Sequence, residues 1–202
     1  MRALVLGGSK SGKSGLAQAL ACTLAGNGPL YYWATMEPAD GEDRQRIARH
    51  LADRAGLGFQ TVEAGRDLIQ ALPQVPAQGT VLLDSVTALL ANEMFSPFNP
   101  AAPEKALRAL LVLGRHCRHV LCVADDIFRD AGRYTGWTED YRAGLARICR
   151  GLAGEFDLVC EAQAGMLRVH KGRLPAGLDC QKNPLGFSDR SLQSATRRNC
   201  GP

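Results

Sequence analysis

A glycine-rich run near the start of the chain has the residue types and the spacing of a phosphate-binding loop. Residues 7–14 fit the pattern G-x-x-x-x-G-K-[ST]. The glycines let the backbone turn so that successive N–H groups point into one concavity, which suits phosphate oxygens. The lysine reaches the β- and γ-phosphates of a nucleotide, and the hydroxyl that follows it ligates the bound Mg²⁺. The residues predicted to bind nucleotide here are Gly7, Gly8, Ser9, Lys10, Ser11, Gly12, Lys13 and Ser14.

The segments on either side of this run supply the context that the motif needs. Residues 3–6 are apolar and typical of a buried strand, and residues 14–20 have helical spacing. A strand–loop–helix unit of this kind adds the positive end of the helix dipole to the loop. The alternative is an ordinary glycine-rich turn between a strand and a helix. The loop alone specifies neither the nucleotide nor the reaction.

A carboxylate follows a second apolar run. Asp84 comes directly after residues 80–83, which predict a buried strand. In P-loop proteins a carboxylate at such a position holds Mg²⁺, so Ser14 and Asp84 are predicted as the metal ligands. Apolar strands that end in aspartate without binding a metal are the alternative.

A histidine with cationic neighbours lies on a predicted polar helix, residues 42–54. His50 and Arg46 are four residues apart and share a face. An exposed, solvated helix face is the simplest interpretation of such a segment. A neutral imidazole is nevertheless a competent nucleophile toward an activated phosphorus when cations hold the phosphates, and Arg46, Arg49 and Arg54 are suited to that task.

Further candidate residues follow other predicted strands. Open α/β folds bind ligands at the carboxyl ends of their strands. The aromatic strand 30–35 places Ala34, Thr35 and Met36 at that edge, although ordinary strand-end residues are the simpler interpretation.

Two adjacent carboxylates, Asp125 and Asp126, follow the apolar strand 120–124. We interpret them as caps of the next loop, with cation binding as the alternative. Residues 127–140 are predicted to form a loop that closes over a substrate. The remaining predicted elements are strands 58–64, 156–160 and 166–170, and helices 67–72, 86–95, 103–116 and 141–154.

The composition indicates one soluble α/β domain. A chain of 202 residues is long enough for a sizeable core, and its net charge of +4 includes no basic patch interleaved with stacking aromatics, so we expect no nucleic-acid partner. The seven cysteines are scattered without a C-x-x-C pair, which favours free thiols in a reducing cytoplasm. No apolar run is long enough to span a membrane. We expect a cytoplasmic protein with a catalytic domain over residues 1–172 and a poorly ordered tail over residues 173–202.

The order of these motifs resembles a known family, the bifunctional adenosylcobinamide kinase/adenosylcobinamide-phosphate guanylyltransferases of cobalamin biosynthesis. The resemblance covers residues 1–95 and depends on five segments with matching order and spacing. These are the phosphate loop at residues 7–14, Tyr-Trp-Ala-Thr at 32–35, Arg-Ile-Ala-Arg-His at 46–50, Thr-Val-Glu at 61–63, and Leu-Leu-Asp-Ser-Val-Thr at 82–87 with Asn92 following.

The resemblance implies a two-step enzyme with a RecA-like P-loop fold and a mostly parallel sheet, assembled as a trimer. Such an enzyme phosphorylates adenosylcobinamide with ATP or GTP and then transfers GMP from GTP to that phosphate, through a GMP-histidine at the position of His50. Lys13 is implied as the second catalytic residue. The implied nucleotide contacts beyond the loop are Ala34, Thr35, Met36, Leu51, Ala52, Asp53, Arg54, Glu63 and Asp84.

The second half of the chain departs from the family pattern. Residues 124–128 replace a strand end with the pattern N-E-V-G, and residues 141–150 replace a helix with the pattern F-R-D-x-x-G-x-x-N-Q. The loss of the carboxamides in that helix leaves the kinase step and the acceptor open. Two alternatives remain: another P-loop small-molecule kinase with Asp125 or Asp126 as base, and a nucleotide-binding protein that has lost catalysis.

Overall fold

The computed structural model describes residues 1–38, 40–95, 97–129, 132, 134–176 and 178, without the side chains of Glu42, Asp43, Arg46 and Asp53. Seven strands form one sheet in the order β3-β2-β4-β5-β1-β6-β7. All neighbouring strands are parallel except β6 and β7, which are antiparallel. The strands are β1 (Arg2–Gly7), β2 (Leu30–Ala34), β3 (Gln60–Glu63), β4 (Thr80–Asp84), β5 (His119–Asp125), β6 (Leu158–Gln163) and β7 (Met166–Lys171).

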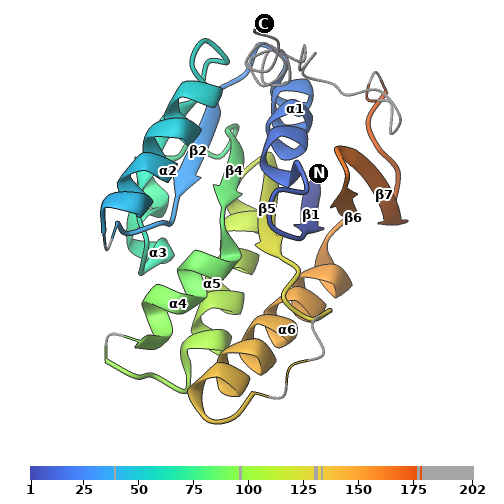
Figure 1. Cartoon of the computed structure of the whole chain (residues 1–202). Coiled ribbons are helices and arrows are strands. Elements are labelled where there is room, and N and C mark those ends of the chain that lie inside the picture. The colour runs from blue at the N-terminus through green and yellow to red at the C-terminus, as the bar shows by residue number, and fades with distance from the viewer. Residues whose placement is uncertain (39, 96, 130–131, 133, 177, 179–202) are drawn as a thin grey trace, which may run out of the picture.

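Helices cover both faces of the sheet (Figure 1). One face of the sheet is covered by α1, which packs against β1, β4, β5 and β6. The other face is covered by α4 and α5, which both contact β5, and by α6, which contacts β1. The helix α2 lies beside the β2 and β3 end of the sheet. The helices are α1 (Lys13–Ala25), α2 (Gly41–Asp53), α3 (Leu68–Ala71), α4 (Val86–Phe95), α5 (Ala102–His116) and α6 (Trp137–Glu155), with a 3-10 turn at Leu72–Gln74.

The apolar runs of the sequence form the central strands because both of their faces are buried. Successive side chains of a strand point to opposite faces, so Ala3 and Val5 join the cluster under α1 while Leu4 joins the cluster under α4, α5 and α6. Burial of such runs on both faces provides the main driving force for folding of the sheet. The sheet edge at the carboxyl ends of β1, β2, β4 and β5 is thereby fixed in position.

The predicted mostly parallel α/β sheet is confirmed, including the strand at residues 80–84, the helix at 86–95 and the terminal strand pair. The predicted loop over residues 127–140 is wrong over its last four residues, because α6 begins at Trp137. Glu139 and Asp140 lie in its first turn, where carboxylates favour the positive end of the helix dipole. The predicted helix at residues 67–72 is a single α-turn followed by a 3-10 turn ending before Val75.

Most of the predicted tail, residues 173–202, lies outside the described residues. Of the part that is described, Leu174 and Leu178 pack against the apolar cluster under α1. Among the described residues, no helix has the length and apolarity needed to cross a membrane.

Candidate active site

The glycine-rich loop joins β1 to α1 at the carboxyl edge of the sheet, as predicted. It leaves β1 at Gly7 and enters α1 at Lys13, with Gly12 at φ +88° in the left-handed region. Two backbone hydrogen bonds shape it: the amide of Ser11 donates to Gly8 O at 3.3 Å, and the amide of Gly165 donates to Ser11 O at 3.0 Å. The turn between β6 and β7 therefore holds the loop in place through this second hydrogen bond.

The start of the loop has no room for a side chain. A Cβ added at Gly7 would lie 2.5 Å from Ser11 Oγ and 2.9 Å from Ala162 O, so the glycine is required by close approach. The hydroxyl of Ser11 is buried and has no hydrogen-bond partner within the described part of the chain. A buried hydroxyl without a partner costs free energy, and a phosphate oxygen in the loop would satisfy it.

The side chain of Lys13 lies across the mouth of the loop. Its ammonium donates to Gly8 O at 3.2 Å and lies 2.7 Å from Asp125 Oδ1. The interpretation of Asp125 as a loop cap is therefore wrong, because strand pairing places it opposite Gly7, beside the lysine. The same interpretation is confirmed for Asp126, whose Oδ1 accepts from the amide of Phe128 at 3.3 Å.

Asp84 ends β4, which β5 separates from the loop strand β1. Its Oδ2 accepts a hydrogen bond from the Tyr32 hydroxyl at 3.0 Å, and no hydrogen bond joins it to Ser14 in the described structure. The carboxylate of Asp84 and the hydroxyl of Ser14 are both oxygen ligands of the type that Mg²⁺ prefers, so the residues present fit the predicted metal. The described residues contain no group of three or more His, Cys, Asp or Glu side chains arranged for a metal ion.

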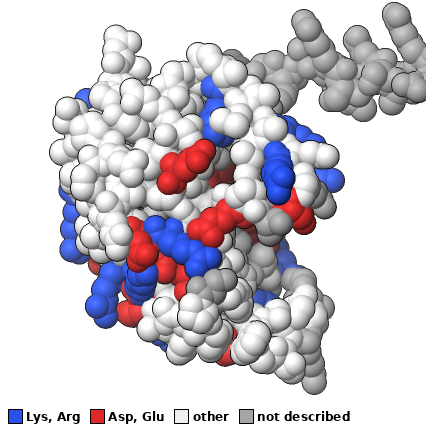
Figure 2. Space-filling model, turned by 90° about the vertical axis from the view of Figure 1, so that its left-hand side faces the viewer, with Lys and Arg blue, Asp and Glu red and all other residues white. Residues whose placement is uncertain are grey.

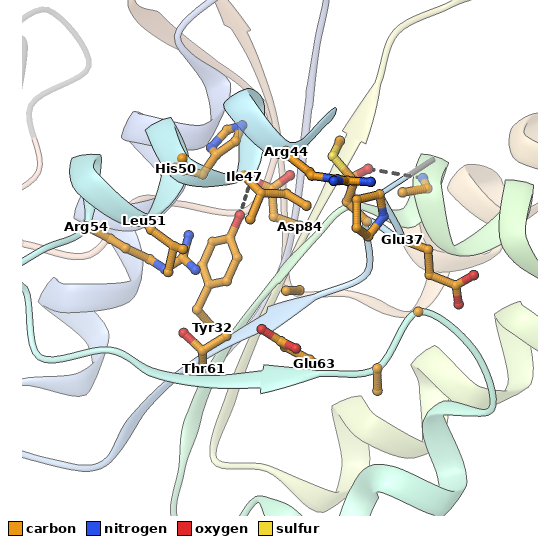
Figure 3. A pocket seen from close by; sticks show the side chains of 18 residues that line it. Tyr32, Glu37, Arg44, Ile47, His50, Leu51, Arg54, Thr61, Glu63 and Asp84 are labelled. Carbon is orange, nitrogen blue, oxygen red and sulfur yellow. Dashed lines mark hydrogen bonds between the residues drawn. The ribbon is translucent and has the colours of Figure 1, made fainter. Parts of the chain in front are cut away.

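A pocket of about 570 Å³ opens beside Asp84 between α2 and the ends of β2 and β3. Figure 3 shows His50 and Leu51 reaching it from α2 and Arg54 from the turn that follows α2, with Tyr32, Thr61 and Glu63 below. Its lining is mainly apolar with a few polar groups, as in small-molecule sites. The lining residues are Tyr32, Ala34, Met36, Glu37, Pro38, Arg44, Ile47, Ala48, His50, Leu51, Arg54, Thr61, Glu63, Ala64, Gly65, Asp84, Ser85 and Ala88.

Arg54 is the buried cation of this pocket. Only 6% of the residue is exposed, and its guanidinium lies 3.8 Å from the centroid of the Tyr32 ring. No carboxylate among the described side chains forms a salt bridge with it. Burial raises the pKa of Tyr32, as does the nearby Asp84, while Arg54 opposes them, so the phenol stays protonated and donates to Asp84.

His50 enters the pocket from the last turn of α2. Its Nδ1 is buried and has no hydrogen-bond partner in the described part of the chain. An imidazole that no carboxylate or carbonyl holds is available to a bound ligand.

Ion pairs and hydrogen bonds hold the wall of the pocket opposite α2. Arg66 pairs with Glu37 at 3.0 Å, and Figure 2 shows acidic and basic side chains interleaved across the face that carries α2 and α3. Asn92 donates to Thr35 O at 2.7 Å and to Gly65 O at 3.0 Å, which ties α4 to the ends of β2 and β3. The hydroxyl of Thr35 donates to Ser85 O at 2.7 Å.

Residues 3–169 match the family model described as "Cobinamide kinase / cobinamide phosphate guanyltransferase". The chain belongs to this family. It is 42% identical over 94 residues to the "Bifunctional adenosylcobalamin biosynthesis protein CobP" of Pseudomonas aeruginosa, a match that covers 46% of the chain. The match spans only about half of that relative, 52% of its length.

The fold is also found among solved structures. The flagellar accessory protein FlaH from Methanocaldococcus jannaschii superposes with a TM-score of 0.51 at 13% identity, over 89% of this chain and 82% of that one. A likeness at this identity concerns the fold alone, and it supports the RecA-like P-loop arrangement of the sheet and its helices.

The predicted site residues fall into two separate groups, the residues of the phosphate loop and the residues that line the pocket. The pocket brings together Ala34, Met36, His50, Leu51, Arg54, Glu63 and Asp84, whereas none of residues 7–14 lines it. Two predicted contacts lie elsewhere: Ala52 is exposed outside the pocket, and Thr35 is fully buried with its hydroxyl bonded to Ser85. The side chain of Asp53 lies outside the described residues.

Sequence reasoning missed two residues of this region. It used Tyr32 only as part of a motif, yet the phenol bridges Asp84 and Arg54. It gave Asp125 no role toward Lys13, because the strand order that makes β5 the neighbour of β1 is not readable from local spacing. A signal for Asp125 was present, since it follows a buried strand at the ligand-binding edge.

Proposed function

We propose that this chain transfers GMP from GTP to cobinamide phosphate through a covalent GMP-histidine at His50, and that it also phosphorylates cobinamide with ATP or GTP. The observation that carries the proposal is that His50 shares one pocket with Arg54, Glu63 and Asp84, at the same sheet edge as the phosphate loop. A generic phosphate loop does not require an imidazole there.

The two sites are separated by a distance that one nucleotide can bridge. Neighbouring strands of a sheet lie about 4.8 Å apart, so β1 lies about 10 Å from β4, which carries Asp84, and about 14 Å from β2, whose end lines the pocket. These separations are comparable with the extent of a nucleoside triphosphate. Phosphates held by residues 7–14 and a nucleoside in the pocket would place the α-phosphorus between them, within range of α2.

The transfer divides into two displacements. In the first, an imidazole nitrogen of His50 attacks the α-phosphorus, a P–N bond forms, the bond to the β-phosphate oxygen breaks, and pyrophosphate leaves. In the second, a phosphate oxygen of the acceptor attacks the same phosphorus, the P–N bond breaks, and the imidazole is released. Each displacement has an activated phosphorus and a good leaving group, which makes both easier than one direct transfer.

Residues of the chain supply most of the electrostatic stabilisation. When a nucleotide binds, the ammonium of Lys13 would leave its ion pair with Asp125 and contact the β- and γ-phosphates. The buried guanidinium of Arg54 would neutralise the negative charge that develops at the α-phosphate. Bound Mg²⁺, which Ser14 and Asp84 would hold, adds positive charge at the phosphates. Glu63 can accept hydrogen bonds from the N1–H and exocyclic amine of guanine, groups that adenine does not present in that arrangement.

Labelled GTP separates this proposal from its alternatives. GTP labelled at the α-phosphorus should leave acid-labile label on the protein and, with cobinamide phosphate, yield a labelled GDP conjugate. Label that appears only from the γ-position, with no protein adduct, would indicate another P-loop kinase. Tight GTP binding without turnover of either cobinamide or cobinamide phosphate would indicate a nucleotide-binding protein without catalysis. From the family resemblance we also propose a homotrimer, which sedimentation equilibrium tests.

A further inference from the structure

Four aromatic rings form a continuous surface where α4 ends and α6 begins. The rings of Phe98 and Trp137 stack with centroids 5.4 Å apart and an interplanar angle of 16°. Phe95 lies 6.5 Å from Phe98 and 5.8 Å from Tyr141. We call these four residues the aromatic platform. Figure 1 places the end of α4 and the start of α6 side by side on the same side of the molecule.

The platform is exposed to an extent that folding alone does not explain. Trp137 is 65% exposed, and Phe95 and Phe98 are 41% and 39% exposed. The other tryptophan, Trp33, is fully buried in the core. Contiguous exposed apolar surface is a mark of interaction and ligand-binding sites. The rings are also held in place, because an isolated β-bridge joins Phe95 to Phe98 and the amide of Asn99 donates to Met94 O at 2.8 Å.

Hydrogen bonds connect the platform to the phosphate loop. The Tyr141 hydroxyl donates to Thr87 O at 2.9 Å, and the Thr87 hydroxyl accepts from the amide of Asp125 at 2.8 Å. The carboxylate of Asp125 is in turn paired with Lys13. Burial raises the pKa of Tyr141, and Asp125 raises it further, which agrees with their proximity. A chain of polar contacts therefore runs from Tyr141 of the platform through Thr87 and Asp125 to the lysine of the phosphate loop.

We propose that the aromatic platform binds the corrin ring of the cobinamide acceptor and presents its hydroxyl or phosphate arm to the loop. This inference depends on the proposed function for the identity of the acceptor. A corrin is a broad ring with many methyl groups on its periphery, with axial ligands on its cobalt, and it carries its reacting group on a flexible side arm. Aromatic rings bind such an apolar periphery by burying its area.

The chemistry of the platform favours this occupant over the nucleotide. The pocket at α2 already offers a guanidinium, a carboxylate and an imidazole suited to GTP, whereas the platform consists of two phenyl rings, one indole and one phenol whose hydroxyl is engaged by Thr87. The two surfaces are linked to different strands of the binding edge: Tyr32 of the pocket bonds to Asp84 on β4, whereas Tyr141 of the platform is linked through Thr87 to Asp125 on β5. A donor and an acceptor can then converge on the same phosphates.

Equilibrium dialysis of dicyanocobinamide against the full chain tests the inference without requiring turnover. Loss of a stacking ring typically weakens binding about five- to hundredfold, so Trp137→Ala should raise the Kd for cobinamide by about tenfold or more. Trp137→Phe keeps a ring and should stay within about threefold of the unchanged chain. Ile69→Ala is the matched control, because Ile69 is an exposed apolar residue (55%) on α3, outside the platform. None of the three should change adduct formation from GTP.

Each outcome has a distinct meaning. A Kd in Trp137→Ala within twofold of the unchanged chain would overturn the inference and leave the proposed function untouched. A change of oligomeric mass in Trp137→Ala without a change in Kd would overturn it too, and would identify the platform as a contact between copies of the chain. Absence of cobinamide binding by the unchanged chain would overturn both, whereas absence of the GTP adduct alone would count only against the proposed function.

Discussion

The ammonium of Lys13 lies 2.7 Å from the carboxylate of Asp125, so the loop lysine is paired with an anion of the chain itself. A nucleotide phosphate has to compete with that carboxylate for the same cation. Strand pairing sets this relationship, because β5 is the neighbour of β1 and Asp125 is opposite Gly7.

Replacement of Asp125 should therefore strengthen nucleotide binding when no metal is present. In Asp125→Asn the competing charge is lost, and we expect GTP to bind about tenfold more tightly in EDTA at low salt, equivalent to ~1.4 kcal/mol. The gain should shrink as salt is added, because screening weakens charge interactions at partly exposed sites. Asp126→Asn is the control, since Asp126 pairs with Arg129 instead of Lys13. Weaker binding in Asp125→Asn would refute this description of the pair.

A methyl group at the first loop glycine should disrupt the loop. In Gly7→Ala the added Cβ meets Ser11 Oγ and the backbone oxygen of Ala162, whereas at Gly8 a Cβ meets nothing within 4 Å. We expect Gly7→Ala to lower the free energy of unfolding by about 1–3 kcal/mol, as overpacking does, and to abolish GTP binding. The free energy of unfolding of Gly8→Ala, measured in urea, should stay within about 1 kcal/mol of that of the unchanged chain. Equal urea midpoints for the two variants would contradict the geometry.

The Tyr32 phenol should matter more for metal use than for folding. Tyr32→Phe keeps the ring under Arg54 but removes the hydrogen bond to Asp84, a loss of about 1 kcal/mol in unfolding free energy. Because Asp84 then lacks its orienting donor, the Mg²⁺ concentration for half-maximal adduct formation should rise several-fold. The metal titration is the decisive readout. An unchanged Mg²⁺ midpoint would mean that Asp84 does not act through the metal.

The buried thiols should be unreactive in the folded protein. Burial raises the pKa of Cys117 to about 11 and that of Cys149 to about 12, since a thiolate is poorly solvated there. Alkylation needs the thiolate, so at pH 8 neither residue should react with iodoacetamide until the chain is unfolded, and the rate should rise as the pH increases toward these values. Peptide mass spectrometry after timed alkylation measures this. Cys22, which is only partly buried, is the internal reference. Modification of Cys149 as fast as Cys22 would contradict the packing.

The sequence predicted correctly those features that depend only on the residues of one short segment. The loop at residues 7–14, the strand that ends in Asp84 and the helix that carries His50 all lie where their patterns predicted. Periodicity and apolar runs report burial directly, which is why the strands of the sheet were predictable.

Features that depend on neighbours far apart in the chain were not predictable in this way. Asp125 meets Lys13 only because of the strand order, and the aromatic platform joins residues from α4 and α6 that are about forty positions apart. The start of α6 was mistaken for loop because Gly132 and Gly136 precede it and a helix-capping side chain is absent from the described N-cap. The separation of the loop from the pocket at His50 is likewise a property of the whole sheet.

The mass of the protein after incubation with GTP and Mg²⁺ shows directly whether His50 carries the nucleotide. The unchanged chain should gain the mass of one guanylyl group (GMP less one water), and fragmentation should place that mass on His50. His50→Asn should gain nothing, while His170→Asn, which changes an exposed histidine on β7 outside the pocket, should label fully. Full labelling of His50→Asn, or an adduct on another residue, would contradict the account.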